Sequence, residues 1–548
     1  MTRLKIMPLG GVGETGALNC MLYETEDTAI LVDCGVGFAD ERHPGANLIL
    51  IDFNDLESYR DKLKAIVLTH GHEDHLGAVG FLRQKFNIPI YATPFTMGIV
   101  RQKFSQRGLE LAKLNQYEAG DSFTIGDINV ETVFINHSIL DAAALLISTD
   151  EAKVFHITDF KIDHSAPGGK VIDLARIKKM GEEGLDLLLM DSTNVFSRGW
   201  TTSETTVRAN LLERFTKIKG RIIACLFSSN MYRIQSLVEC ARITGRKISF
   251  TGRSTKEYTR IAREIAKLDL NGVELYDVED IARFPDSEVL LLVTGSQAEP
   301  RSVLQRLSHD MFKPFRLREN DTLLMSSKMI PGNEGPVLEM LDRIALLGPE
   351  IITEDLELPI HASGHAKQDE LREILRLTKP RYFIPIHGSY RHLKKHLEIA
   401  HDEGLKPEQT ILILNGDQVE VAKDNVRQVN AEIFNRIFLD ESDTEIKREA
   451  LSRRRKFAFN GVVGVGTTYD TLRKVFVTDV SLDLSAMHGG EFGEECLMEL
   501  RDFLGKAIAK AGRMERDKVE KFIKVEVRQF YKHKLKIRPE VMVLVSEV

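Results

Sequence analysis

The sequence predicts an α/β protein with three folded parts. These are a sandwich of two β-sheets between helices, an α/β domain inserted into the sandwich, and a small α+β domain after it. Over the first 200 residues, short apolar runs end in polar residues and alternate with amphipathic segments, as in sheets covered by helices. From about residue 205, longer helix–strand units with nearly continuous apolar strands indicate a buried parallel sheet.

Seven apolar runs in the first 200 residues are predicted as strands, because strand-forming residues fill them and turn-forming residues bound them. Between them, FLRQKF (81–86) predicts a helix. The seven runs are ALNCMLYE (17–24), TAILVDCG (28–35), KAIVLTHGH (64–72), IPIYAT (88–93), INVETVFIN (128–136), AALLIST (143–149) and KVFHITD (153–159).

The central block has the longer units. Residues 207–218 and 232–245 carry apolar residues at helical spacing and are predicted as helices. RIIACLFS (221–228), KISFTG (247–252) and SEVLLLVTG (287–295) are predicted as parallel strands. The block ends near SSKMIPGNEG (326–335), and the sandwich pattern resumes with RYFIPIHG (381–388) and TILILNGDQVEV (410–421).

A charged stretch from Asp440 to Lys456 has little apolar content and is predicted as a linker. After it, residues 461–470 and 473–482 predict a hairpin-like strand pair, Glu495–Ala511 and Arg516–Lys532 predict helices, and VMVLVSEV (541–548) a last strand. The second helix should bury Val519, Phe522, Ile523, Val527 and Phe530. The predicted divisions are 1–205 and 356–435 for the sandwich, 206–355 for the insert, 436–456 for the linker and 457–548 for the last domain.

Composition excludes several classes of protein. The 548 residues include 74 Lys and Arg against 81 Asp and Glu, so a formal net charge of −7 argues against binding nucleic acid by bulk charge. Residues 501–538 nevertheless hold 13 basic and 5 acidic residues, either as a solvated helical face or as a surface that steers phosphate. Five scattered cysteines, no signal sequence and no apolar stretch of membrane-spanning length predict a cytoplasmic protein without a membrane partner.

The sharpest chemical signal is THGHEDH (69–75), directly after the strand KAIVL. Imidazole suits zinc, and added carboxylates extend the choice to harder cations such as manganese. In a tightly turned backbone, His70 and His72 can share one metal. Asp74 and His75 can then face a second metal, so that two cations clamp a hydroxide and a phosphoryl oxygen.

Further ligands should come from other strand ends. His137 in FINHS, Asp159 in HITDF and His387 in FIPIHG each follow an apolar run, which gives seven predicted ligands with Asp159 as the bridge. Asp33 in ILVDCG is either a partner for the free ring N–H of a ligand histidine or a residue that caps a turn. Ser228 and Ser229 precede a helix, where they either hold a phosphate or cap the helix.

The pattern HxHxDH, followed by a distant His, an Asp and a last His, resembles the metallo-β-lactamase superfamily. The long block between Asp159 and His387 resembles its β-CASP branch, whose members cut nucleic acids. Within that branch the chain is similar to the ribonuclease J family. The segments that carry this resemblance span the chain: PLGGVGETGALN, ITDFKID, MDSTN, CLFSSNMYRIQ, VTGSQAEP, IPGNEG and HASGHA.

The resemblance implies an αββα metallo-β-lactamase sandwich with an inserted β-CASP domain and a C-terminal domain. It assigns Asp191, His365 and His387 to the branch's extra motifs. It also implies a pocket for the terminal phosphate of RNA, made by Ser228, Ser229, Asn230, Ser363, Gly364 and His365.

The implied activity is hydrolysis of RNA phosphodiesters with two zinc or manganese ions. Asp74 would orient the water and His365 would protonate the departing 3′ oxygen. The expected enzyme is a 5′-to-3′ exonuclease on 5′-monophosphorylated single-stranded RNA, with endonuclease activity, in RNA maturation and decay. A homodimer or homotetramer and partners such as a helicase are expected. A DNA-directed β-CASP nuclease and a non-catalytic scaffold in an RNA-processing complex remain as alternatives, whereas the insert and SGHA argue against a thioester or lactam hydrolase.

Overall fold

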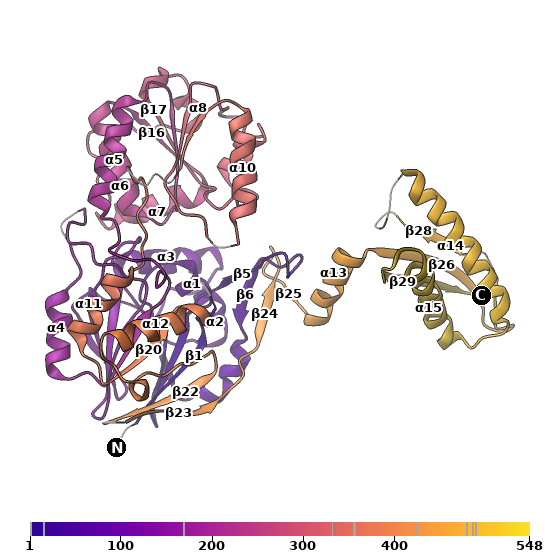
Figure 1. Ribbon diagram of the computed structural model, residues 1–548, viewed down its shortest axis with the longest axis horizontal. Helices are drawn as coiled ribbons and strands as arrows, with labels where there is room; N and C mark the ends of the chain where they lie inside the picture. The colour runs from indigo at the N-terminus through magenta and orange to yellow at the C-terminus, as the bar shows by residue number, and fades with distance from the viewer. Residues whose placement is uncertain are drawn as a thin grey trace. The chain divides into compact units, whose positions relative to one another are not determined.

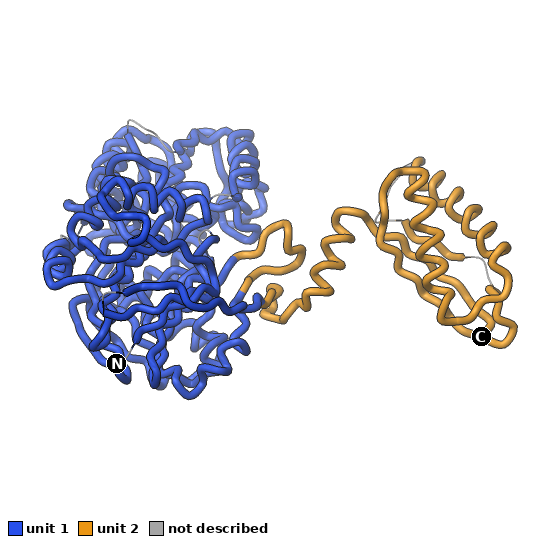
Figure 2. The backbone as a smooth tube through the Cα atoms, turned by 60° about the horizontal axis from the view of Figure 1, so that its bottom comes forward, with its two compact units in different colours: residues 1–37, 50–436 blue, residues 38–49, 437–548 orange. Residues whose placement is uncertain are grey.

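The computed structural model describes residues 3–14, 17–167, 170–330, 332–353, 358–423, 425–477, 480–484, 487 and 490–548. Two compact units make up the chain (Figure 2). Unit 1 comprises residues 1–37 and 50–436, and unit 2 comprises residues 38–49 and 437–548.

Two large sheets form the sandwich of unit 1. The first has the strand order β23-β22-β1-β3-β4-β7-β8-β9 and the second the order β10-β11-β12-β13-β14-β20. Side chains from both sheets, such as Ile30 and Leu145, fill one buried core between them. The strands of the first sheet are β1 (Leu4–Gly10), β3 (Cys20–Glu24), β4 (Ala29–Val32), β7 (Leu63–Val67), β8 (Ile90–Ala92), β9 (Leu114–Gln116), β22 (Asp417–Ala422) and β23 (Asn425–Ala431). Those of the second are β10 (Ser122–Ile125), β11 (Ile128–Phe134), β12 (Ala143–Ser148), β13 (Lys153–Ile157), β14 (Leu187–Asp191) and β20 (Tyr382–Ile386).

Helices cover the outer faces of the sandwich (Figure 1). Ile177, Ile374 and Ile399, from α4, α11 and α12, pack with the outward side chains of the second sheet in a second core. Helix α3 contacts β8 and β9 of the first sheet. The helices of the sandwich are α1 (Glu73–Leu76), α2 (Val79–Lys85), α3 (Pro94–Gln106), α4 (Leu174–Glu183), α11 (Gln368–Thr378) and α12 (Tyr390–Asp402), with 3-10 turns η1 (Phe53–Tyr59) and η3 (Pro407–Gln409).

The inserted domain is a parallel sheet of order β16-β17-β15-β18-β19 with helices around it (Figure 1). Its central strands β15 and β17 are buried along their whole length, which explains their uninterrupted apolar sequences. The strands are β15 (Ile222–Cys225), β16 (Lys247–Thr251), β17 (Val289–Val293), β18 (Thr322–Met325) and β19 (Glu350–Ile352). The helices are α5 (Glu204–Lys217), α6 (Met231–Thr244), α7 (Arg253–Glu264), α8 (Val278–Ile281), α9 (Val303–Ser308) and α10 (Glu334–Leu346), with the 3-10 turn η2 (Asp286–Glu288).

A short parallel pair joins distant parts of unit 1. Strand β2 (Val12–Gly13) pairs with β21 (Gly388–Ser389), so that Val12 lies opposite Gly388. This pairing brings the loop after the first strand to the end of β20, where His387 stands.

Unit 2 contains the C-terminal domain, whose strand β26 pairs with β27 and β28 in antiparallel fashion and with β29 in parallel. Val519, Ile523, Val527 and Phe530 are buried as predicted, and Phe522 is partly buried against the same core. The elements that lie in unit 2 or cross its boundaries are β5 (Gly37–Phe38), β6 (Leu48–Ile51), β24 (Arg436–Leu439), β25 (Glu445–Ile446), α13 (Arg448–Asn460), β26 (Val462–Asp470), β27 (Val475–Phe476), β28 (Ser481–Asp483), α14 (Gly490–Ala511), α15 (Arg516–Leu535) and β29 (Glu540–Glu547).

The predicted strands and helices are confirmed with shifted ends, apart from three segments. Of the predicted strand 473–482, Val475–Phe476 and the residues from Ser481 onward are strand, and residues 478 and 479 lie outside the described residues. Of TILILNGDQVEV, only the part from Asp417 onward is a strand, because residues 411–416 make isolated backbone bonds such as Ile411 N–H to the carbonyl of Phe383. Helix α13 begins inside the stretch predicted as a linker and continues past its end at Lys456. The predicted boundary between residues 355 and 356 lies outside the described residues.

Candidate metal centre

The predicted metal-binding motif lies where β7 ends and α1 begins. His70 and His72 stand before the helix, whereas Asp74 and His75 belong to it. The rings of His70 and His75 are fully buried. Because burying a polar ring costs free energy unless it is paired or ligated, these two imidazoles require partners in the interior.

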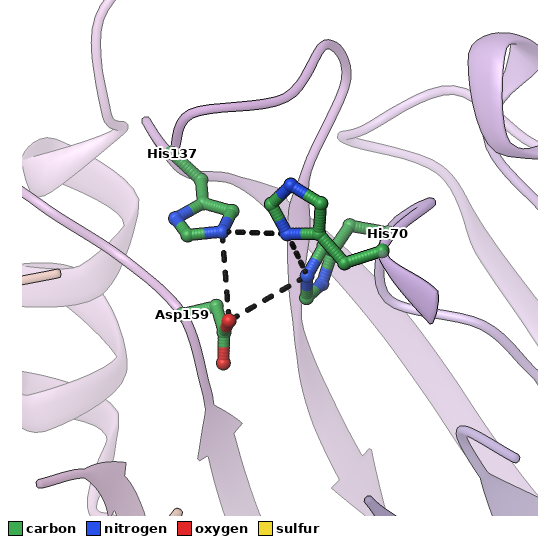
Figure 3. Close-up of side chains that lie close together, drawn as sticks. His70, His137 and Asp159 are labelled. Atoms are coloured by element: carbon green, nitrogen blue, oxygen red, sulfur yellow. Dashed lines mark hydrogen bonds and ion pairs between the residues drawn. The ribbon is translucent and has the colours of Figure 1, made fainter. Parts of the chain in front are cut away.

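Four of the predicted ligands form a first group, with their ligand atoms all within 4.8 Å of one another (Figure 3). His72 Nδ1 lies 3.1 Å from His70 Nε2 and 3.0 Å from His137 Nε2. Asp159 Oδ2 lies 3.6 Å from His70 Nε2 and 3.5 Å from His137 Nε2. Three imidazole nitrogens and one carboxylate oxygen therefore converge, which is a donor set that fits zinc and related cations.

Asp74, His75, Asp159 and His387 form a second group at the same spacing. His75 Nε2 and His387 Nε2 each lie 3.5 Å from Asp74 Oδ2 and 3.3 Å from Asp159 Oδ1. The buried Nε2 of His387 has no hydrogen-bond partner among the described residues. A buried ring nitrogen that faces two carboxylates without a hydrogen bond fits the position of a metal ligand.

Asp159 joins the two groups, since its Oδ2 faces the first and its Oδ1 faces the second. Its backbone has φ +37°, and His387 and Asp33 have φ +52° and +62°. Each of the three follows the end of a strand, and the left-handed conformation is costly for residues other than glycine. At these three positions the left-handed backbone turns the side chain toward the centre.

The two groups differ in charge. Burial lowers the pKa of His70 and His137, and it lowers the pKa of His72 to about 4, so these rings are neutral near pH 7. Burial also disfavours charge on His75, but the carboxylates of Asp159, Asp74 and Asp33 outweigh it and raise the pKa of His75 to about 10. A cation in the second group would therefore replace a proton on this ring.

Partners on the far side of the ligand rings fix their orientation. The Nδ1–H of His75 donates to Asp33 Oδ2 over 2.7 Å, and the Thr69 N–H and hydroxyl also donate to Asp33. His137 Nδ1 donates to the carbonyl of Gly364 over 2.8 Å. These bonds leave the Nε2 atoms of both rings pointing toward the groups of ligands. Asp33 thus accepts the ring N–H of a predicted ligand histidine.

His365 and Asp191 adjoin the second group. His365 Nδ1 donates to Asp191 Oδ2 over 2.8 Å, while His365 Nε2 lies 3.9 Å from Asp159 Oδ2. Asp191 Oδ1 also lies 3.2 Å from His387 Nδ1. Burial opposes a charge on His365, but the carboxylates of Asp191 and Asp159 outweigh it and raise the pKa of this ring. The side chain of His365 is 21% exposed, so the ring is partly accessible beside the predicted ligands.

The residues predicted to hold a phosphate occupy two segments with separate partners. Ser363 Oγ accepts hydrogen bonds from Asn194 Nδ2 (2.7 Å) and from the N–H of His365 (3.1 Å). Ser228 Oγ lies 3.1 Å from Thr255 Oγ1. Ser228 and Ser229 are half-buried in the loop before α6.

Asn230 and Gly364 have roles in the fold. Asn230 is buried, and its side chain accepts from the N–H of Arg233 as the N-cap of α6. Gly364 packs against a ligand, since an added Cβ would stand 2.6 Å from the His137 ring. Only glycine therefore allows this close approach without moving His137.

Four stretches of the chain match known protein families. Residues 28–209 match "Beta-lactamase superfamily domain", 219–344 "Ribonuclease J, beta-CASP domain", 359–412 "Zn-dependent metallo-hydrolase RNA specificity domain" and 449–548 "Ribonuclease J C-terminal domain". Ribonuclease J of Thermus thermophilus is 35% identical over 469 residues, which cover 84% of this chain and 81% of that protein. The chain belongs to the ribonuclease J family.

Other ribonuclease J proteins align over similar or longer stretches. The Helicobacter pylori (strain B128) protein is 36% identical over 464 residues, which cover 84% of this chain and 67% of that protein. The Corynebacterium glutamicum protein is 30% identical over 549 residues, which cover 98% of this chain and 75% of that protein. A solved protein of unknown function from Enterococcus faecalis shares the fold, with a TM-score of 0.53 and 15% identity over 76% of this chain and 100% of its own. No helix among the residues described here is long and apolar enough to cross a membrane.

Three polar residues of this ribonuclease J site were missed by the sequence predictions. Asn19 Nδ2 donates to Asp74 Oδ2 over 3.1 Å and lies 3.0 Å from His75 Nε2. Thr193 Oγ1 lies 2.7 Å from His387 Nδ1, and Asn194 Nδ2 also donates to the carbonyl of His365 (2.9 Å). Thr193 and Asn194 stand in MDSTN and Asn19 in the GALN of the opening segment, so the signal was present without a role attached to it.

Proposed function

We propose that this chain is a metal-dependent ribonuclease. The observation that carries the proposal is the pair of ligand groups that share Asp159, with all seven predicted ligands in them. Two cations held there would lower the pKa of a shared water and offset the negative charge of a phosphodiester. Zinc or manganese fits the mixed imidazole and carboxylate donors.

Asp74 and Asn19 serve the attacking side of the reaction. Asp74 is half-buried beside His75, His387 and Asp159, and the charges of these histidines outweigh the effect of burial, so that its pKa falls to about 2. The ionised carboxylate accepts from Asn19 Nδ2, which fixes its orientation. An oriented carboxylate can accept a hydrogen bond from the attacking water and direct the water's lone pair toward phosphorus.

His365 serves the leaving side. Its Nδ1–H is held by Asp191, so the proton on Nε2 is the one available for transfer. The carboxylates of Asp191 and Asp159 raise the pKa of His365, which favours the protonated ring. As the new P–O bond forms and the bond to the 3′ oxygen breaks, His365 Nε2 gives its proton to the departing oxygen.

The substrate of this proposal is single-stranded RNA with a 5′ monophosphate. Hydroxyl and backbone N–H groups of Ser228, Ser229, Asn230, Ser363 and Gly364, together with His365, would hold the terminal phosphate. Asn230 contributes by capping α6, whose N-terminus faces the same loop. A terminal phosphate held there favours stepwise 5′-to-3′ removal of nucleotides, and internal cleavage requires only the metal centre.

Membership of the ribonuclease J family also supports a proposal for where and with which partners the enzyme acts. The enzyme would act in RNA maturation and decay in the cytoplasm, as a homodimer or homotetramer, with partners such as a helicase. The ribonuclease J C-terminal domain at residues 449–548 would make the subunits associate.

The experiment compares 5′-labelled RNA that bears a monophosphate, a triphosphate or a hydroxyl, with added manganese or zinc and with a chelator. Release of labelled mononucleotide from the monophosphate strand alone, lost with chelator and in Asp74→Ala, is expected. Asp61→Asn is the matched control, since Asp61 is exposed. Equal hydrolysis of a DNA strand of the same sequence would favour the DNA-directed alternative. Intact RNA in every lane with metal bound would favour a non-catalytic scaffold.

A further inference from the structure

Two surface segments beside the centre carry exposed aromatic and cationic side chains. The segment 196–200 follows Asn194, which bonds to His365 and Ser363, and the segment 389–395 follows His387. Both segments thus begin within two residues of the groups that form the site. Neither the run 192–200 nor the run 388–397 contains an aspartate or glutamate.

The two segments meet at Phe196. Its ring stands edge-on to that of His392, with centroids 5.1 Å apart, and the guanidinium carbon of Arg391 lies 5.5 Å from its centroid. Ser389 Oγ, 2.6 Å from His392 Nδ1, holds the imidazole in place. Phe196 is 48% exposed, so part of the ring remains open to a ligand. We call Phe196, Arg391 and His392 the aromatic platform.

Further exposed aromatic and cationic side chains lie in the same two segments as the platform. Tyr390 is 45% exposed, and the Lys394 ammonium lies 5.4 Å from its ring centroid. Trp200, the single tryptophan of the chain, is 46% exposed. Arg198 is exposed between Phe196 and Trp200. Open aromatic faces interleaved with cations complement a polyanion that carries flat bases.

We propose that the aromatic platform stacks a base of the RNA strand at the rim of the metal centre, with Arg391 over the ring and toward the backbone phosphates. This inference rests on the proposed function and deepens it by naming a contact for the bases. Stacking on an aromatic ring tolerates every base, because each base has a π-face, and it is worth about 1–3 kcal/mol per base, or roughly fivefold or more in affinity. Such a contact suits an enzyme that must accept any sequence.

The first test separates binding from chemistry. With 5′-monophosphorylated single-stranded RNA, Phe196→Ala and Arg391→Ala should each raise KM about fivefold or more and leave kcat near the wild-type value. Phe196→Tyr should restore KM, because it keeps the ring. Phe459→Ala is the matched control, since it removes a ring that is 78% exposed in unit 2.

The second test is direct. RNA with 5-iodouridine, irradiated on the wild-type enzyme, should crosslink to the peptide that contains Phe196, and rapid mixing with RNA should change the fluorescence of Trp200. The platform would be overturned if the wild type cleaves RNA but Phe196→Ala leaves KM unchanged and no crosslink forms at Phe196. The ribonuclease proposal would then still stand. A crosslink at Phe196 without cleavage would overturn the ribonuclease proposal and support the platform. Absence of both would overturn both.

Discussion

Asp33 Oδ2 lies 2.7 Å from Nδ1 of His75, and both side chains are almost fully buried. The carboxylate holds the ring so that Nε2 faces Asp74 and Asp159, and its charge favours electron donation by the imidazole. Asp33 does not itself face a predicted cation position, but it sets the orientation and the donor strength of the His75 ring.

Asp33→Asn should lower metal affinity about 10–100-fold, because the amide keeps the shape and the left-handed backbone but loses the charge. Metal retained after dialysis against graded chelator, measured by mass spectrometry, checks this. Asp61→Asn, at an exposed position, should retain metal as the wild type does. Full retention in Asp33→Asn would show that the carboxylate charge is unimportant.

Asp159→Asn and His365→Gln should fail in different ways. Asp159 presents one oxygen to each ligand group, so its variant should lose bound metal and activity together. His365 lies beside the groups, so its variant should keep metal while RNA hydrolysis falls roughly 10²–10⁴-fold. Metal content and single-turnover rates measured on the same samples separate the two. Metal loss in His365→Gln would make it a ligand and not an acid.

Gly364→Ala should displace His137 and weaken the first ligand group. The added methyl group would stand 2.6 Å from the ring, and the carbonyl of residue 364 is also the ring's hydrogen-bond acceptor. Gly505→Ala is the control, because nothing lies within 4 Å of an added Cβ there. Titration of the metal-free proteins with zinc should show weaker binding in Gly364→Ala alone, and equal affinities would contradict the packing argument.

His396 should make the fold sensitive to acid. The ring is fully buried, packs 4.9 Å from Phe383 and bonds to Ser192, and burial lowers its pKa to about 3. Below its ordinary pKa of 6.5, the unfolded chain binds a proton that the folded chain does not. Stability is therefore fully present above pH 6.5 and falls by about 1.4 kcal/mol per pH unit as the pH drops toward 3.

The variant His396→Gln isolates this contribution, since it cannot bind the proton. Urea midpoints of the wild type and the variant, measured at pH 7 and pH 5, should converge as the pH falls. The other histidines are common to both proteins and cancel in the comparison. A constant difference between the two midpoints would contradict the assignment.

The C-terminal domain should govern association. Removal of residues 450–548 is expected to lower the mass of the particle in solution from that of an oligomer to that of a smaller species, measured by light scattering. Leu544→Asp tests the same idea without truncation, because Leu544 is 75% exposed on β29. An unchanged oligomer in both variants would remove the assembly role.

The sequence could indicate which side chains converge at the centre, because four of them are crowded into 69–75 and the others end apolar strands. Asn19 could not be predicted in its role, since it reaches Asp74 only through the packing of strands far apart in the chain. The same holds for Phe196 and His392, which meet through the fold and not through spacing.

The fold was predictable where burial leaves a recognisable pattern of apolar residues in the sequence. Strands such as β15 are apolar throughout because both faces are covered. Residues 411–414 are equally apolar, but the stretch 411–416 makes irregular backbone bonds, such as Ile411 N–H to the carbonyl of Phe383 in β20, so composition overstated the strand. Helix α13 has a single buried side chain, that of Leu451, and it forms from residues with good helix propensity. Because it buries no apolar stripe, apolar periodicity could not predict it.

The order of the ligands along the chain has a consequence during synthesis. The first group is complete once residue 159 has been made, whereas the second also needs His387, which follows more than 200 residues later. His137 of the first group is moreover held by the carbonyl of Gly364, so both groups depend on residues made after the insert. A nascent chain therefore cannot carry out the proposed hydrolysis until it has been made through His387.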